Sequence, residues 1–115
     1  MYTVIRKYDI VPGLLEEFIQ QVQQSLVPII NQVPGVREYA LVEIGENEVA
    51  AISTFETLHD AKTSAHLTSA WVAEHTEQFI QGFTKLMAGN VRVYKGPICL
   101  PEPKSMHEEL LQGVF

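Results

Sequence analysis

The hydrophobic period of the chain changes at a Pro-Gly pair near its start. Residues 2–10, YTVIRKYDI, are rich in β-branched and aromatic side chains and predict a strand. After the Pro-Gly at 12–13, apolar residues recur at spacings of three and four through residues 15–30, with glutamate and glutamine between them. This pattern predicts an amphipathic helix. A second Val-Pro-Gly, at 33–35, ends it, and Pro28 predicts a kink or a frayed last turn because proline lacks a backbone donor.

Two alternating segments follow, VREYALVEI at 36–44 and EVAAISTFE at 48–56. The short connection GEN between them predicts an antiparallel hairpin. Thr57 and Asp60 then have the spacing of a capping box and indicate the start of a helix.

The following segment predicts two helices, because Thr68-Ser69 is expected to interrupt the first and cap the second. The second helix is expected to end at Gly89-Asn90, and VRVYK at 91–95 is expected to form the fourth strand. The residues expected to share one face of that second helix are Val72, His75, Phe79, Phe83 and Leu86.

The resulting order is β-α-β twice, which predicts an α+β, ferredoxin-like βαββαβ domain over residues 1–97. Its four-stranded antiparallel sheet carries both helices on one face. Valine and isoleucine fall on both faces of the strands, so we expect a second subunit to cover the other face in a homodimer. The alternative is a monomer whose exposed sheet face is partly apolar. Residues 98–115 form a proline-rich tail in which Ser105 and Glu108 predict a short helix. We expect the tail to pack on the domain or on the dimer partner; a lid over a pocket is the alternative.

Composition narrows the class of protein. A chain of 115 residues, 46% hydrophobic and 19% charged, favours one globular domain. The net charge of −6 argues against nucleic-acid binding, which needs a basic surface. No apolar run approaches the roughly 18 residues of a membrane span, and the N-terminus resembles a strand rather than a signal peptide, so no membrane association and a cytoplasmic location are expected. One cysteine, Cys99, allows neither an internal disulfide nor a cysteine-based metal site.

Three residues stand out as candidates for chemistry. Trp71 and His75 are four apart and so share a helix face; the imidazole is a candidate general base and the indole a stacking surface for a flat aromatic. The structural alternative is a histidine bonded to a backbone carbonyl beside a tryptophan at the core edge. Arg6 alternates with apolar and aromatic residues on one strand face, where it could pair with Glu43 or bind an anionic substrate group. His59 and His66 are seven apart, not the four at which two histidines share a metal, so no metal site is expected.

The segments MYTVIRKYDIVPGLLEEF, VPGVREYALV and STFETLHDAKTSAHLTSAW resemble the antibiotic biosynthesis monooxygenase (ABM) domain family. These are small proteins of the dimeric α/β-barrel superfamily. The resemblance extends over residues 1–97. It rests on the opening strand, the Pro-Gly turns, and the aromatic and histidine positions Phe18, Tyr39, Phe55 and His66.

The resemblance implies an oxidoreductase of the cofactor-independent monooxygenase type, which oxidises a small aromatic or quinol-type substrate with O2 and uses no flavin or metal. The heme-degrading relatives of this superfamily use an asparagine, a tryptophan and a histidine. The corresponding positions here are Arg6, Ala65 and His75, so two of the three differ.

Residues and resemblance together give the leading hypothesis. His75 takes or holds the substrate proton and Arg6 stabilises the oxyanion that results. One alternative is a non-catalytic dimer that binds a small apolar ligand or serves a stress-related role, and a weaker one is heme binding through His75 alone. In the leading hypothesis the substrate-binding residues are Trp71, Tyr8, Tyr39, Phe55 and Phe79.

Overall fold

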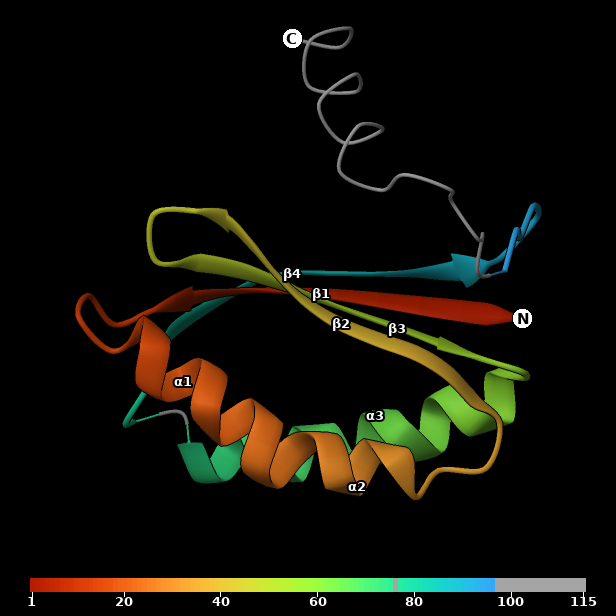
Figure 1. The fold of residues 1–115 in the computed structure, drawn as a ribbon, viewed down its shortest axis with the longest axis horizontal. Helices are drawn as coiled ribbons and strands as arrows, with labels where there is room; N and C mark the ends of the chain where they lie inside the picture. Colours follow the sequence, from red (N-terminus) through yellow and green to blue (C-terminus); the bar gives the residue numbers. More distant parts are fainter. Residues whose placement is uncertain (76, 97–115) are drawn as a thin grey trace, which may run out of the picture.

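The computed structural model describes residues 1–75 and 77–96. A four-stranded antiparallel sheet in the order β2-β3-β1-β4 carries all the helical segments on one face (Figure 1). This arrangement confirms the α+β, ferredoxin-like prediction. The tail at 98–115 lies outside the described residues. In chain order the elements are β1 (Tyr2–Ile10), α1 (Leu15–Gln21), η1 (Val22–Leu26), α2 (Val27–Asn31), β2 (Val36–Gly45), β3 (Glu48–Phe55), α3 (Leu58–His75) and β4 (Ile80–Asn90).

The strand register decides which side chains of the central strand β1 face the helices. Arg6 lies opposite Ala51 of β3 on one side and Leu86 of β4 on the other. Because side chains alternate along a strand, Val4, Arg6, Tyr8 and Ile10 all point toward the helices. The main core cluster joins Tyr8 and Ile10 to the buried faces of the helices, including Phe18 and Trp71.

The first helical segment contains one wide turn immediately before Pro28. The Val27 N–H bonds to the Val22 carbonyl, five residues back, so η1 is a π turn between α1 and α2. Pro28 has no N–H to give to the carbonyl four residues back, and its ring would crowd that carbonyl. A locally wider turn relieves this conflict. The predicted disturbance is therefore a π turn, and the last turn is α2 rather than a frayed end.

The helix α3 begins as predicted but continues without the predicted break. The Asp60 N–H donates to Thr57 Oγ1 at 3.1 Å, which confirms the capping position. The interruption expected at Thr68-Ser69 is wrong, because α3 is one helix of 18 residues. Hydroxyl side chains are accommodated inside it: the Thr63 hydroxyl bonds to the His59 carbonyl one turn back, and Thr68 is buried against the sheet.

The last strand lies earlier in the chain than the sequence pattern indicated. The predicted helix through Phe79 and Leu86 is wrong: α3 ends at His75, and residues 80–90 form β4, paired with β1 along nearly its whole length. The strand predicted at 91–95 is also wrong. Residues 91–96 instead cross the helix-free face of the sheet, and the Tyr94 hydroxyl donates to Glu38 of β2, the strand at the opposite edge, at 2.7 Å (Figure 1).

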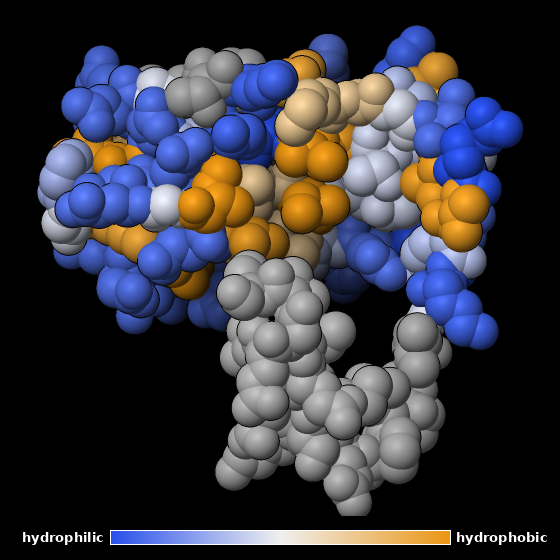
Figure 2. Space-filling model, turned by 90° about the horizontal axis from the view of Figure 1, so that it is seen from above, coloured by the Kyte–Doolittle hydropathy of each residue, from blue (hydrophilic) through white to orange (hydrophobic). Residues whose placement is uncertain are grey.

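The helix-free face carries a hydrophobic row across all four strands. Ala40, Ile52, Ile5 and Met87 are successive cross-strand partners on that face. Met87 is 39% exposed and Val42, beside the row, 40% exposed. Figure 2, seen from this side, shows hydrophobic side chains gathered between hydrophilic ones. The predicted mixture of apolar residues on both faces is therefore present.

Candidate functional site

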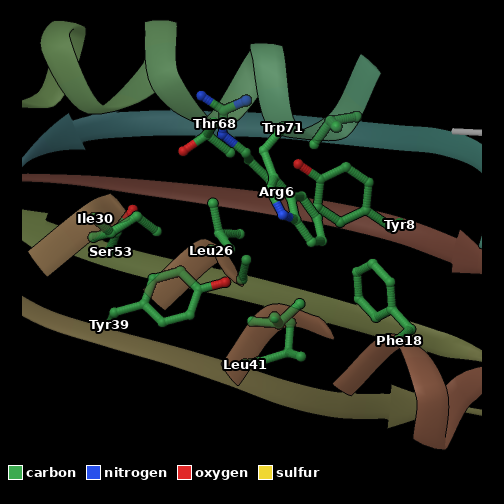
Figure 3. A pocket seen from close by; sticks show the side chains of 13 residues that line it. Arg6, Tyr8, Phe18, Leu26, Ile30, Tyr39, Leu41, Ser53, Thr68 and Trp71 are labelled. Atoms are coloured by element: carbon green, nitrogen blue, oxygen red, sulfur yellow. The ribbon is translucent and has the colours of Figure 1, made fainter. Parts of the chain in front are cut away.

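A small cavity lies between the sheet and the helices, beneath β1, β2 and β3 (Figure 3). Its volume is about 20 Å³, which holds about one water molecule. Its walls are largely apolar, with a few polar groups, and come from every layer of the fold. The lining residues are Arg6, Tyr8, Phe18, Val22, Leu26, Ile30, Tyr39, Leu41, Ala51, Ser53, Thr68, Trp71 and Val72.

Arg6 and Tyr8 supply the charge and the hydroxyl of this cavity. Arg6 extends from β1 toward α3, as Figure 3 shows, and its positive charge lies close enough to the Tyr8 hydroxyl to influence it. Burial raises the pKa of Tyr8, and the nearby positive charge of Arg6 partly opposes that rise. Tyr8 is therefore a neutral phenol at neutral pH, beside a fixed positive charge.

The pairing of Arg6 with Glu43 that the sequence allowed is not found. The salt bridges within the described part of the chain join Lys7 to Glu48 and Arg37 to Glu56, and Glu43 is exposed. Arg6 thus faces the cavity beside Tyr8, and no carboxylate of the described residues forms a salt bridge with it. This leaves its charge available to an anion.

Tyr39 closes the cavity from the side of the edge strand β2. Burial, together with the nearby Tyr8, raises the pKa of its hydroxyl strongly, so this phenol too stays neutral. Tyr39, Leu41 and Val22 also line an outer groove of about 250 Å³ between α1, η1 and β2. These three side chains therefore form the wall that separates the cavity from the surface.

Trp71 forms the opposite wall, and its indole is held by a hydrogen bond and by a ring contact. Its Nε1 donates to Ser25 Oγ at 2.7 Å, and its ring lies 6.0 Å from the ring of Phe18. The side chain is 4% exposed. The π turn that contains Ser25 therefore helps to set the position of the indole in the cavity.

His75 lies one turn beyond Trp71 and does not line the cavity. Its ring stacks on the indole with centroids 4.2 Å apart, and Nδ1 is 2.8 Å from the Trp71 carbonyl. Because a carbonyl only accepts, Nδ1 carries the proton of this bond. This is the arrangement of the structural alternative, a histidine bonded to a backbone carbonyl.

The two predicted phenylalanines lie outside the lining as well. Phe55 is buried in a second cluster with Val4, Val33 and Ala61, and Phe79 packs edge-on to Phe18 at 6.0 Å. Of the seven predicted site residues the structure thus brings Arg6, Tyr8, Tyr39 and Trp71 together, and places His75, Phe55 and Phe79 behind them.

Most of the lining residues were not predicted as site residues, and three of those not predicted are Phe18, Ser53 and Thr68. Phe18 contributes to the family resemblance alone, and the sequence pattern predicts a helix break at Thr68 instead of a cavity position. Ser53 alternates with Ala51 on β3, so the hairpin register was the signal that could have found it.

Metal binding finds no support among the residues the structure describes, since no three of their histidine, cysteine, aspartate and glutamate side chains cluster closely enough to hold an ion. Of the heme-degrading pattern, Arg6 and Ala65 do meet at a groove between α3 and β1, but His75 is not among its lining residues. None of the helices in the described ranges is both long and apolar enough to cross a membrane.

The layered sheet with a cavity between sheet and helices places the chain among small α+β proteins with an internal site. The model of the antibiotic biosynthesis monooxygenase family matches residues 1–82, and the chain belongs to this family. The match ends within β4, before residue 97, to which the resemblance was expected to extend.

Solved structures share this fold at low sequence identity. A protein of unknown function from Nitrosomonas europaea, NE2512, has a TM-score of 0.68 at 15% identity, covering 85% of this chain and 95% of its own. A candidate antibiotic biosynthesis monooxygenase from Chloroflexus aurantiacus J-10-fl has a TM-score of 0.64 at 18% identity, with 83% and 96% covered. MupZ from Pseudomonas fluorescens has a TM-score of 0.68 at 11% identity, with 98% and 84% covered. No curated protein matches the chain.

Proposed function

We propose that this protein is a monooxygenase that oxidises a small aromatic or quinol-type substrate with O2. The observation that carries the proposal is the Arg6–Tyr8 pair in an otherwise mainly apolar cavity walled by Trp71 and Tyr39. A flat, weakly acidic molecule fits this combination, because its rings pack on the aromatic walls while its ionised oxygen meets the guanidinium.

Arg6 would stabilise the substrate anion. A fixed cation in a water-poor cavity favours the ionised form of a phenol or enol far more than water does. Tyr8 stays neutral, so its hydroxyl can donate a second hydrogen bond to the same oxygen. Arg6 and Tyr8 thus act on the charge that develops when the substrate loses its proton.

For a substrate with an acidic CH2, such as an anthrone, the reaction proposed converts this CH2 into a carbonyl. Loss of one proton gives the anion, which transfers electrons to O2, and a carbon–oxygen bond forms at that carbon. The proton then returns to the terminal oxygen and gives a hydroperoxide. The hydroperoxide then loses water as its O–O bond breaks and the second C–H proton leaves, so CH2 plus O2 becomes C=O plus H2O. O2 is the oxidant and supplies both oxygen atoms. The protein contributes binding, orientation and stabilisation of the anion.

His75 remains the proposed proton acceptor. Its Nδ1 is bonded to the Trp71 carbonyl, which leaves Nε2 to accept a proton. Since the ring lies behind Trp71, this role requires the indole to shift or a water molecule to relay the proton. A substitution of Arg6 is therefore the more direct test of the proposed reaction, whereas a substitution of His75 tests only the proton-transfer step.

Substrate entry requires the cavity to open. Its volume of about 20 Å³ does not admit even a single aromatic ring, whereas the outer groove that shares Tyr39, Leu41 and Val22 has a volume of about 250 Å³. A substrate that displaced the Tyr39 side chain would join the two spaces. We propose this wall as the entrance.

Oxygen uptake tests the proposal. Metal-free protein is mixed with a panel of anthrones and hydroquinones, and uptake is compared among wild type, Arg6→Gln, His75→Ala and Arg37→Gln. Arg37 is an exposed arginine on β2 and serves as the matched control. We expect Arg6→Gln to reduce kcat by about 100- to 1,000-fold, as loss of an oxyanion donor does, with Arg37→Gln unchanged. Equal uptake by wild type and Arg6→Gln would contradict the role of Arg6, and equal uptake by His75→Ala would contradict the base.

We also propose a homodimer formed through the helix-free face, supported by the row Ala40, Ile52, Ile5 and Met87. A sheet face with this many apolar residues is more stable when another protein surface covers it than when it is exposed to water. A cytoplasmic location stays a prediction.

A non-catalytic ligand-binding protein is the second candidate, and the position of His75 favours it. The His75 imidazole is bonded to a backbone carbonyl and lies behind the cavity wall. This structural role is sufficient to explain its position, and no catalytic role is needed. In that case substrate-like ligands bind without oxygen uptake, and their affinity shows no break across the range of roughly pH 5 to 8 in which imidazoles titrate.

A further inference from the structure

A second groove lies on the other side of Arg6, between α3 and the strands β1 and β4. Its volume is about 210 Å³, an order of magnitude larger than that of the central cavity. One wall is a single stripe of α3 at spacings of three and four. The other wall consists of helix-facing residues of the two strands. The lining residues are Leu58, Ala61, Lys62 and Ala65 of α3, and Tyr2, Val4, Arg6, Leu86 and Ala88 of the strands.

The apolar walls of this groove face solvent. Leu86 is 53% exposed and Leu58 46% exposed. Both lie at the groove because β4 is an edge strand and α3 covers it incompletely. The alanines at 61, 65 and 88 keep the space between the two walls open. An elongated apolar body would cover these leucines and remove their surface from water.

The groove is positively charged although the chain is acidic. The chain has 14 acidic and 8 basic residues, yet two of the basic ones, Arg6 and Lys62, line this groove, and none of the carboxylates in residues 1–75 and 77–96 does. Arg6 also lines the central cavity, but a guanidinium has five N–H donors and can face both spaces. Lys62 is exposed on α3, where its ammonium can meet a bound anion while its stem covers apolar surface.

The two cations lie at different depths of the groove: Arg6 is at one end, and Lys62, next to Ala61 on α3, lies between Arg6 and the other end. The strand β1 and the helix α3 run side by side in the same direction, since Val4 packs with Ala61 whereas Tyr8 packs with Trp71. From Tyr2 to Arg6 the groove therefore extends about 13 Å along β1, at about 3.3 Å per residue. Arg6 lies at one end of this length, and Tyr2 and Leu58 lie at the other.

From this arrangement we infer that the groove binds an apolar monocarboxylate, with the carboxylate between Arg6 and Lys62 and the hydrocarbon body running toward Tyr2 and Leu58. A carboxylate suits a guanidinium because its two oxygens match two parallel N–H donors. Arg6 lines both this groove and the central cavity. A carboxylate bound in the groove would therefore compete with the oxidised substrate for the same guanidinium. The inference itself concerns binding and holds whether or not the protein is an oxygenase.

Calorimetric titration of the full chain with hexanoate, octanoate and decanoate tests this inference. We expect one site per chain, affinity that rises about 15-fold for each added pair of methylenes until the groove is filled, and weakening at higher salt. Octanol, which has the same body without the charge, should bind more weakly than octanoate. Equal affinities of octanol and octanoate would overturn the role of the two cations.

Matched variants locate the site. Lys62→Gln should weaken octanoate binding about two- to fivefold, the effect of an exposed ion pair. Lys85→Gln, the same change at an exposed residue on the helix-free face of β4, should leave it unchanged. Ala65→Leu should weaken it at least tenfold by filling the groove, with circular dichroism used to verify its fold. Because Lys62 is exposed, its variant remains informative even if Ala65→Leu fails to fold.

Crystals with a terminally brominated octanoate give a direct readout that does not depend on catalysis. Bromine density against Leu58 and Tyr2 supports the inference. Bromine density in the central cavity, or an octanoate affinity that neither Lys62→Gln nor Ala65→Leu changes, would show that the groove is not the site. Either result would leave the oxygen-uptake experiment unaffected, so the two proposals can fail separately.

Discussion

The indole of Trp71 and the hydroxyl of Ser25 form the hydrogen bond that joins α3 to the π turn. Nε1 donates to Ser25 Oγ at 2.7 Å, and the same hydroxyl donates to the Gln21 carbonyl at 2.7 Å. Ser25 thus uses its donor within its own helical segment and its acceptor in the bond to α3. The wall that Trp71 provides is therefore positioned by a residue that does not itself line the cavity.

Replacing Ser25 by alanine should destabilise the protein. The change leaves the buried Trp71 N–H without its partner, which costs about 1–3 kcal/mol of the free energy of unfolding. Thr63→Ala is the matched control, because the Thr63 hydroxyl also bonds the carbonyl one turn back but is exposed. Urea denaturation should show a clear loss for Ser25→Ala and a small change for Thr63→Ala. Similar losses for both would mean that the bond to Trp71 adds nothing.

The two Val-Pro-Gly repeats should differ in their tolerance of alanine. Gly13 and Gly35 both have positive φ, +88° and +81°. An added Cβ meets nothing within 4 Å at Gly13, whereas at Gly35 it overlaps Asp60 Oδ2 and lies 2.9 Å from Asp60 Cγ. Gly13→Ala should cost about 1–2 kcal/mol through backbone strain. Gly35→Ala should cost roughly 1–3 kcal/mol more, because the capping carboxylate of α3 must move.

Thermal or urea unfolding of the two glycine variants measures that difference directly. Asp60→Ala in the Gly35→Ala background is the informative control, since it removes the overlapping atoms. In the Asp60→Ala background, Gly35→Ala should then lower the free energy of unfolding by no more than Gly13→Ala lowers it in the wild type. A persistent difference would place the strain elsewhere than at Asp60.

The sequence was sufficient for those parts of the fold that depend on local signals. The strand at 2–10, the hairpin and the cap at Thr57 depend on alternation, turns and capping residues, and the structure confirms each. The segment at 80–90 was misread because Phe79 and Leu86 follow helical spacing with His75. Its strand state is set by non-local pairing with β1, which local periodicity does not contain.

The site was predictable where strand alternation determines direction. Arg6 and Tyr8 had to face the same way, and the position of the helices then put both in the cavity. The position of His75 was harder to predict. The spacing of four residues places His75 on the face of Trp71, but it also brings the imidazole within reach of the carbonyl one turn back. That contact, with the Trp71 carbonyl, turns the ring away from the cavity lining.

Stability should fall at alkaline pH in a way that depends on Tyr8 and Tyr39. Burial raises the pKa of both phenols above their usual value of about 10. The folded protein therefore keeps these protons at a pH where the unfolded chain releases them. The stabilisation is fully present below about pH 10 and is lost above it, by up to about 1.4 kcal/mol per pH unit for each phenol.

Urea denaturation between neutral pH and pH 11 measures this loss. Tyr39→Phe and Tyr8→Phe should each flatten the decline, since phenylalanine has no proton to release. If both variants declined as steeply as the wild type, the burial of these phenols would not be the cause.

The helix-free face should mediate dimerisation, and two adjacent residues of β4 provide a matched test. Met87 lies on that face in the apolar row, whereas Leu86 points to the helix side, and both are substantially exposed in the single chain, 39% and 53%. Met87→Glu would bury two unpaired carboxylates in a symmetric interface, so it should raise the dimer Kd at least about tenfold. Leu86→Glu adds the same charge one residue away and should leave the dimer intact. Sedimentation velocity over a concentration series, with circular dichroism to verify folding, measures both. A wild type that stays monomeric, or two variants that weaken association equally, would contradict an interface on this face.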